Sequence, residues 1–439
     1  MQKRHGWIAV WAAVLLGGCV TYRPAPIETL DVLRGLEAIA APDETSGLSK
    51  RELAAFAITH HPALSATRAR LGIRSALLVE AGLLPDPQLG WGAMDLVASE
   101  IVEGTSSSLE VISGFSTMLP LLRPGERDAK VALAERELEL AKCDLLTAEW
   151  QLTRDVHIAC EEQLVAELRL ARTRELASLA GSTADYFDRA KGAGAATAIQ
   201  ANLARGELLS IRLEEVRAEN RAQQARQRLN ALLGIPPDSE LPLRADEEPS
   251  LPESLRDADP GSLAEAAMSL RPDLVAREVA YRASEEGVRL AVAKQYPSIA
   301  IGTGIQITIP IFSGFGRPRI RTALARRDRA ARELAASVHQ VRGEIAAAFA
   351  RWTVSARKVD LIEAELLPNA EETLELSREA LEAGEATLLE TLALQRALLE
   401  ARTTQAEAIA DRAKQTWELL SASGLLLPEP KTLVEETIR

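Results

Sequence analysis

Proline, glycine and leucine residues recur at fixed spacings in the two halves of this 439-residue chain. The matched pairs are Pro62 with Pro272, Leu64 with Leu274, Pro87 with Pro297, Gly92 with Gly302, Pro120 with Pro310, Gly194 with Gly384, and Gly234 with Gly424. The first four pairs are 210 residues apart and the last three are 190 apart. Because only two spacings occur, we interpret the chain as two copies of one unit. The second copy is 20 residues shorter, and the difference lies in its β segment.

Each copy is expected to contain a helix, a β-hairpin and two long helices. The first copy is predicted over 48–237, with helix 48–84, hairpin 88–120, and helical runs from 126 to about 182 and from about 184 to 233. Residues 238–260, rich in Pro, Glu and Asp, are predicted as a linker. The second copy is predicted over 261–424, with helix 263–294, hairpin 297–312, and helices from 318 to about 368 and 370–421, followed by a tail at 425–439.

A seven-residue leucine repeat indicates that the long helices pack side by side. Leu138, Leu145 and Leu152 follow this step in the first copy, and alanines lie on one edge of the same stripe. Such a heptad pattern is typical of closely packed antiparallel helices. A run of about 50 helical residues reaches about 75 Å, which is far longer than a globular domain needs.

The second hairpin needs strands from elsewhere. Ile305, Ile307 and Ile309 alternate with polar residues, so the segment has one apolar face and one polar face. Gly302-Thr303-Gly304 provides the turn. A hairpin alone cannot cover its apolar face, so it must join a larger sheet.

The first residues are typical of a secreted lipoprotein. Residues 1–18 combine Lys3 and Arg4 with an apolar core and are predicted to be a signal peptide. The sequence Leu16-Gly17-Gly18-Cys19 resembles the bacterial lipobox, which predicts lipidation of Cys19. Residues 19–47 are then expected to form an extended tether from the lipid to the body.

The sequence carries no motif for catalysis. It lacks Gly-x-Ser-x-Gly, His-Glu-x-x-His, a P-loop and Cys-x-x-Cys. The histidines are too scattered for a metal site, and adjacent acids such as Glu161-Glu162 are expected to be solvated rather than catalytic. The net charge of −12 counts against nucleic acid as a partner. We therefore expect no enzyme activity, no cofactor and no bound metal.

Several short motifs together resemble the TolC-like outer-membrane efflux protein family, the RND-type outer-membrane factors. They are Ala81–Leu89, Ala231–Pro236, Arg271–Leu274, Tyr296–Ser298, Pro310–Gly314 and Leu381–Arg396, and the first of these leans toward the heavy-metal efflux branch. The resemblance implies a mainly α fold, with long antiparallel helices in a periplasmic α-barrel and two hairpins per protomer in an outer-membrane β-barrel. It also implies a homotrimer anchored by outer-membrane lipid, with a periplasmic adaptor protein and an inner-membrane pump as partners.

By the same resemblance, the far ends of the helices form periplasmic tip turns with a gate. The turns would lie around Gly192 and Gly194 in the first copy and around Gly384 in the second. Glu390 matches a gate acid of the family, and three copies would form a cation-attracting ring. Gln200 occupies the same place in the first copy. The alternative is that Glu390 is one solvated acid among many.

Two functions remain open from the sequence. The first is a passive trimeric exit duct of a tripartite efflux system. The second is a lipid-anchored periplasmic scaffold whose barrel no longer pierces the membrane. The short second hairpin motivates the scaffold, because residues 297–312 allow at most about 7 residues per strand, whereas a membrane strand needs roughly 9–11.

Overall fold

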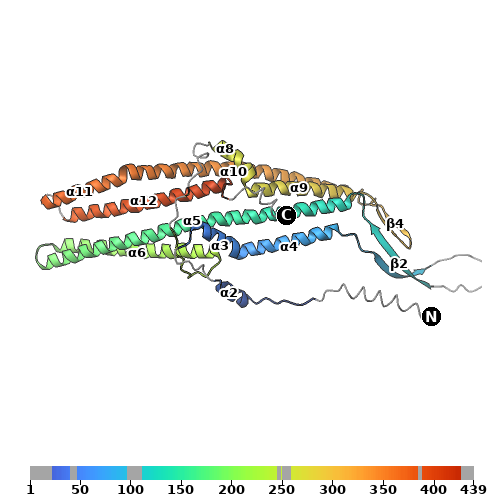
Figure 1. Cartoon of the computed structure of the whole chain (residues 1–439), viewed down its shortest axis with the longest axis horizontal. Helices are drawn as coiled ribbons and strands as arrows, with labels where there is room; N and C mark the ends of the chain where they lie inside the picture. Colours follow the sequence, from blue (N-terminus) through green and yellow to red (C-terminus); the bar gives the residue numbers. More distant parts are fainter. Residues whose placement is uncertain are drawn as a thin grey trace, which may run out of the picture.

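The computed structural model shows an elongated bundle of helices with a small sheet at one end (Figure 1). It describes residues 22–39, 47–95, 111–244, 249, 259–383 and 388–426. The predicted lipidation site Cys19, the tip residue Gly384, and most of the linker and the tail lie outside the described residues. The mainly helical fold predicted from the sequence is confirmed.

The described elements follow the same order in both halves. The first half contains α2 (Thr29–Glu37), α3 (Lys50–His60), α4 (Pro62–Gly82), β1 (Gln88–Asp95), β2 (Val111–Leu121), α5 (Glu126–Gly192) and α6 (Ala198–Leu233). The second half contains α8 (Pro260–Leu270), α9 (Pro272–Ala293), β3 (Ser298–Gly302), β4 (Ile305–Thr308), α10 (Arg317–Leu361), a π-helical turn (Ile362–Leu366), α11 (Leu367–Ala383) and α12 (Leu388–Ala422).

Prolines divide the first predicted helix of each half in two. The Ser49–Glu52 capping box starts α3 as predicted. The helix then stops at His61, and Pro62 occupies the first turn of α4. Pro272 does the same between α8 and α9. Proline lacks an N–H and disfavours helical geometry in the residue before it, so the single helices predicted over 48–84 and 263–294 were wrong.

Two predicted helix breaks were also wrong. The α5 helix runs through Ser182 and Thr183 without interruption. On the other long hairpin, the helical backbone continues through Pro368. The π-helical turn immediately before that proline widens the backbone, which accommodates a residue that cannot donate a hydrogen bond.

The segments before and after the first half are more ordered than the sequence suggests. Residues 29–37, expected to be extended, form helix α2, whose leucines are exposed. The start of the predicted linker packs on the body, because Leu48 N–H donates to Pro242 O and Leu241 is buried in the first core. Because residues 29–37 are helical, the prediction of an extended tether over residues 19–47 was wrong for this segment.

The four strands form one antiparallel sheet in the order β1-β2-β3-β4. The two hairpins join where β2 pairs with β3, for example Met118 with Gly302. A Cβ atom on Gly302 would lie 1.6 Å from the Thr117 carbonyl oxygen, so only glycine fits this position. The second hairpin thus finds its partner strands in the first hairpin. Its own strands have only 5 and 4 residues.

Each half has its own hydrophobic core at the middle of the bundle. The first core contains Leu53, Leu64 and Leu229, and the second contains Leu263, Leu274 and Leu419 at the corresponding positions. Gly234 and Gly424 end the last helix of each half with positive φ and pack on the proline junctions. In the described part of the chain, no helix is both long enough and apolar enough to span a membrane.

Candidate functional site: the tip turns and the seam between the halves

The tip turn of the first half links α5 to α6. Residues 193–197 connect the helices, and Gly194 adopts a left-handed φ of 74°. A capping box between Thr197 and Gln200 then starts α6. Gly192 is the last residue of α5 rather than part of the turn. Only Gly194 therefore needs the conformational freedom of glycine here.

The position of Glu390 is explained by helix capping as well as by the predicted gate. Glu390 lies exposed in the first turn of α12. Its counterpart Gln200 accepts the Thr197 backbone N–H at 2.8 Å in the capping box. The sequence Thr387-Leu-Leu-Glu390 has the same spacing, although Thr387 lies outside the described residues. Helix capping alone therefore accounts for a polar residue at this position.

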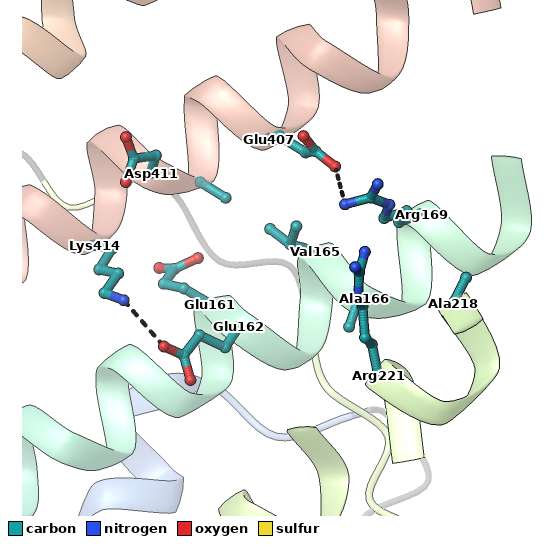
Figure 2. Close-up of a pocket in the computed structure, with 11 residues that line it drawn as sticks. Glu161, Glu162, Val165, Ala166, Arg169, Ala218, Arg221, Glu407, Asp411 and Lys414 are labelled. Atoms are coloured by element: carbon teal, nitrogen blue, oxygen red, sulfur yellow. Dashed lines mark hydrogen bonds and ion pairs between the residues drawn. The ribbon is translucent and has the colours of Figure 1, made fainter. Parts of the chain in front are cut away.

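A second candidate region is the seam where α5 of the first half meets α12 of the second (Figure 2). Arg169 pairs with Glu407 at 3.1 Å, and Lys414 pairs with Glu162 at 3.0 Å. Between these two ion pairs lies a cleft of about 250 Å³, also lined by Asp411. All four paired side chains are roughly one-third to one-half exposed. Ion pairs therefore contribute to the contact between the two halves along this seam, beside apolar contacts of α5 with α9 and α12.

Beside the cleft, the seam ends in a buried polar cluster. Lys50 on α3 donates to Glu161 on α5 at 2.5 Å, and both side chains are less than one-tenth exposed. Trp417 on α12 donates its indole N–H to the same carboxylate at 3.3 Å. This cluster ties together three helices from both halves. The expectation that the Glu161-Glu162 pair is solvated was wrong for Glu161, because only the packing of α3 places Lys50 against it.

His157 completes this cluster. Its ring packs against Trp417 with the centroids 4.0 Å apart, and its Nδ1 lies 2.7 Å from the Thr153 carbonyl oxygen. Burial lowers the pKa of His157, and the nearby positive charges of Lys50 and Arg51 lower it further, although the hydrogen bond to Thr153 opposes them. The neutral imidazole is thus the form that fits this site. Because Trp417 and Lys50 are distant from His157 in the sequence, the sequence did not predict that they lie beside it.

A third polar site lies where the second half begins. Arg271 is 5% exposed and forms a two-point ion pair with Asp273. It also pairs with Glu344 at 2.7 Å and donates to the Ala422 carbonyl oxygen. Its guanidinium lies 5.2 Å from the ring of Trp150, which belongs to the first half. Within the described ranges, no group of three or more His, Cys, Asp or Glu side chains is arranged to hold a metal ion.

The comparisons with known proteins place this architecture in a family. A family model described as "Outer membrane efflux protein" matches the chain twice, at residues 54–235 and 263–425. These two segments cover most of the chain and fall one in each half. The chain therefore belongs to the outer membrane efflux protein family, a family of outer-membrane channels rather than enzymes. Such channels extend from the outer membrane into the periplasm of Gram-negative bacteria.

Two relatives and one solved structure illustrate the likeness. The chain is 25% identical to the cobalt-zinc-cadmium resistance protein CzcC of Cupriavidus metallidurans, over 77% of this chain and 81% of that one. It is also 25% identical to the pyoverdine export outer membrane protein OpmQ of Pseudomonas aeruginosa, over 94% and 95%. The Campylobacter jejuni CmeC outer membrane channel has the same fold, with a TM-score of 0.69 at 15% identity, covering 95% of this chain and 97% of that one.

Proposed function

We propose that three copies of this chain form the passive exit duct of a tripartite efflux system. The observation that carries the proposal is that both outer edges of the helical layer bear a second apolar stripe. Figure 1 shows α6 along one edge and α11 along the other, with α5 and α12 between them. A helix covered on one face only needs one apolar stripe. Two unpaired stripes at opposite edges are what a ring of identical copies requires.

The stripe on α6 lies opposite the face that packs on α5. Leu203, Leu213 and Val216 are 62–66% exposed, whereas Ala204 and Ala218 are buried against α5. With 100° per residue, these two sets fall on opposite sides of the helix. The exposed stripe also includes Ile199 and Leu209. It therefore offers a continuous apolar surface to a neighbouring copy.

The α10–α11 edge bears a matching stripe. Val354, Leu361 and Leu376 are 57–65% exposed and lie opposite buried residues such as Val359 and Leu374. Leu376 precedes Gly384 by 8 residues, and Leu203 follows Gly194 by 9. At 1.5 Å per residue, both side chains lie about 12–14 Å from their tips. The stripes on the two edges are therefore both apolar, and both reach the same distance from the tips.

The sheet supports the same closed assembly. Each copy supplies four antiparallel strands, and β4 at the edge is exposed along its whole length. An open edge invites further pairing, and closure into a barrel removes it. Because a barrel with a filled interior already takes about 8 strands, the twelve strands of three copies leave room for a channel.

We propose an adaptor protein and an inner-membrane pump as partners, because a passive exit duct has no energy source of its own. The relatives are named for unlike substances, resistance to cobalt, zinc and cadmium for one and export of pyoverdine for the other. The Ala81–Leu89 motif leans toward the heavy-metal efflux branch. We therefore propose that the pump selects the cargo and that divalent metal ions are the first cargo class to test.

Cysteine cross-linking and channel recording test the duct. The double variant L203C/L376C should form cross-linked dimers and trimers, and each single variant should not. L209C/V354C is a matched control, because its positions differ in height by about 22 Å along the helices. Purified lipidated wild-type protein should also conduct ions in planar bilayers. Equal cross-linking of both pairs would refute the ring geometry.

The runner-up is the lipid-anchored scaffold. The strands β3 and β4, with 5 and 4 residues, favour it, because they are shorter than the roughly 9–11 residues that a membrane strand needs. A trimer that never conducts ions, and never lets a small sugar swell liposomes, would establish the scaffold and exclude the duct.

Within the duct, we propose that Glu390 contributes to a gate at the tips. Replacing it in E390A should raise the single-channel conductance or weaken cation selectivity, since three carboxylates would be lost from the ring. The control Q200A alters the corresponding capping position without changing charge. An unchanged current in E390A, or an equal change in Q200A, would show that Glu390 serves only as a helix cap.

A further inference from the structure

The chain crosses from sheet to helix at two corresponding places, and the second crossing has an unusual surface. It comprises Ile309–Gly316 between β4 and α10, together with the first turns of α10. Phe312 is fully exposed, Ile311 is 61% exposed and Phe315 is 49% exposed. Next to them, Arg317, Arg319 and Arg321 are exposed as well. We name these six residues the basic-aromatic collar.

Within the part of the chain that the structure describes, the arginines of the collar have no acidic partners, because none of the three forms an ion pair or a side-chain hydrogen bond there. The sequence contains no Asp or Glu between Glu286 and Asp328. Burial lowers the pKa of Lys294 at the end of α9, and the positive charges of Lys130, Arg319 and Arg123 lower it further, although the Glu126 carboxylate opposes them. The surface thus concentrates positive charge.

The first crossing shows that this charge is not a requirement of the fold. There Glu126 is buried and pairs with Arg123 at 3.0 Å and with Lys130 at 3.2 Å. Gly125 and Gly316 are the left-handed N-cap residues of α5 and α10, so Glu126 corresponds to Arg317 and the second crossing has lost the neutralising carboxylate. Both crossings lead from a strand into a long helix. The positive charge of the second crossing therefore calls for a partner outside the protomer.

From this surface we infer that the basic-aromatic collar binds anionic phospholipid headgroups at the periplasmic leaflet of the outer membrane. The inference rests on the proposed function, which places the strands in the membrane and the crossing at its edge. Exposed aromatic rings are suited to the boundary between headgroups and acyl chains. Guanidinium groups form paired hydrogen bonds with phosphate oxygens. The juxtaposition of the two within ten residues supplies both an apolar anchor and an anion contact.

Native mass spectrometry of the detergent-solubilised, lipidated trimer tests the collar with two named probes, phosphatidylglycerol and phosphatidylcholine. Each basic residue near an anionic membrane surface adds to the attraction between the two. The triple variant R317Q/R319Q/R321Q should therefore bind phosphatidylglycerol at least about tenfold more weakly. Its binding of phosphatidylcholine, whose headgroup has a phosphate but no net charge, should weaken much less. The variant R317K/R319K/R321K should retain most of the phosphatidylglycerol binding, since it keeps the charge.

A matched control removes three arginines farther along the same helix. R326Q/R329Q/R332Q changes the net charge equally but lies about 15 Å deeper along α10. It should leave phosphatidylglycerol binding unaltered, whereas F312S should weaken binding of both lipids. Equal loss in both arginine triples would overturn the inference, because it would show only a general charge effect.

Channel recording separates this inference from the proposed function. If the collar arginines line the pore, R317Q/R319Q/R321Q will shift the reversal potential in a salt gradient without changing lipid binding, and that result would overturn the collar. If wild-type protein binds phosphatidylglycerol through the collar but never conducts, the duct fails while the lipid contact stands. Circular dichroism of each variant confirms that a loss of binding is not a loss of folding.

Discussion

The cores within the halves and the seam between them are built from different interactions. Leu53, Leu229 and Leu263 are 0–2% exposed in the cores. Along the seam, half-exposed pairs such as Arg169–Glu407 make the contact, and a cleft remains between them. Burying a leucine stabilises a fold by about 1.5–3 kcal/mol, whereas an exposed ion pair contributes about 0–1 kcal/mol. The leucine cores therefore stabilise each half more strongly than the exposed ion pairs stabilise the contact of α5 with α12 at the cleft.

If three copies form the proposed duct, this difference gives the duct a way to change its width without unfolding. The α5–α6 hairpin is a packed unit, with Ala180 and Ile211 in one cluster and Phe187 and Ala201 in another. At the cleft, the contacts between α5 and α12 include charges that water can replace. A shift of α12 against α5 at this point would break these ion pairs but leave the apolar packing between α5 and α6 intact. The following predictions test that contrast, from the largest expected effect to the smallest.

The largest effect is expected where the seam is buried. K50M should lower the free energy of unfolding by about 3–5 kcal/mol, because it leaves the Glu161 carboxylate buried without its cation. Chemical denaturation of the purified protein measures this. The double variant K50M/E161L should recover much of the loss. A K50M protein as stable as wild type would show that the cluster is no stronger than the exposed ion pairs.

The two cores should respond alike to the same deletion. Leu229 and Leu419 occupy corresponding positions and are 0% and 2% exposed. L229A and L419A should each cost about 2–5 kcal/mol, through lost apolar burial and the cavity left behind. Thermal unfolding followed by circular dichroism provides the measurement. If one variant lost several-fold more stability than the other, the two halves would not be equivalent cores.

Acid should weaken the buried end of the seam through His157. The pKa of His157 is lowered in the folded chain by burial, so the unfolded chain takes up a proton at higher pH than the folded one. The free energy of unfolding should then fall as the pH drops through the ordinary histidine range, near 6.5, toward the lowered folded pKa. H157Q should show a smaller loss between pH 7 and 5 than wild type. If H157Q and wild type lost the same free energy of unfolding between pH 7 and 5, His157 would not be the cause of the loss.

The smallest stability effect is expected along the exposed part of the seam. E162Q/E407Q removes the carboxylates of the two exposed ion pairs drawn in Figure 2, together with the pair of Glu162 and Arg228, and should cost less than about 1 kcal/mol per pair. If the seam governs the width of the duct, the same variant should still raise the open probability in planar bilayers. The control E278Q removes an exposed pair within α9. A seam variant that behaves like E278Q would argue against a moving seam.

Part of the fold could be predicted because its signals are local. The fixed spacing of prolines and glycines located the hairpins, and the Ser49–Glu52 capping box starts α3 as expected. Helix ends were less predictable. Residues 182–184 and Pro368 resemble breaks locally, but long neighbouring helices stabilise continuous backbone there. Packing along the bundle outweighs the propensity of a single residue.

The sequence by itself determined that the chain is doubled, mainly helical and built around two hairpins, because these features depend on spacing along the chain. Only the tertiary structure decided which residues meet across the halves. Lys50 and Glu161 are 111 positions apart, and Trp417 lies 256 positions beyond Glu161, so no local pattern links them. The same holds for the exposed stripes and the basic-aromatic collar. A side chain becomes a buried partner or a free surface only when distant helices are placed around it.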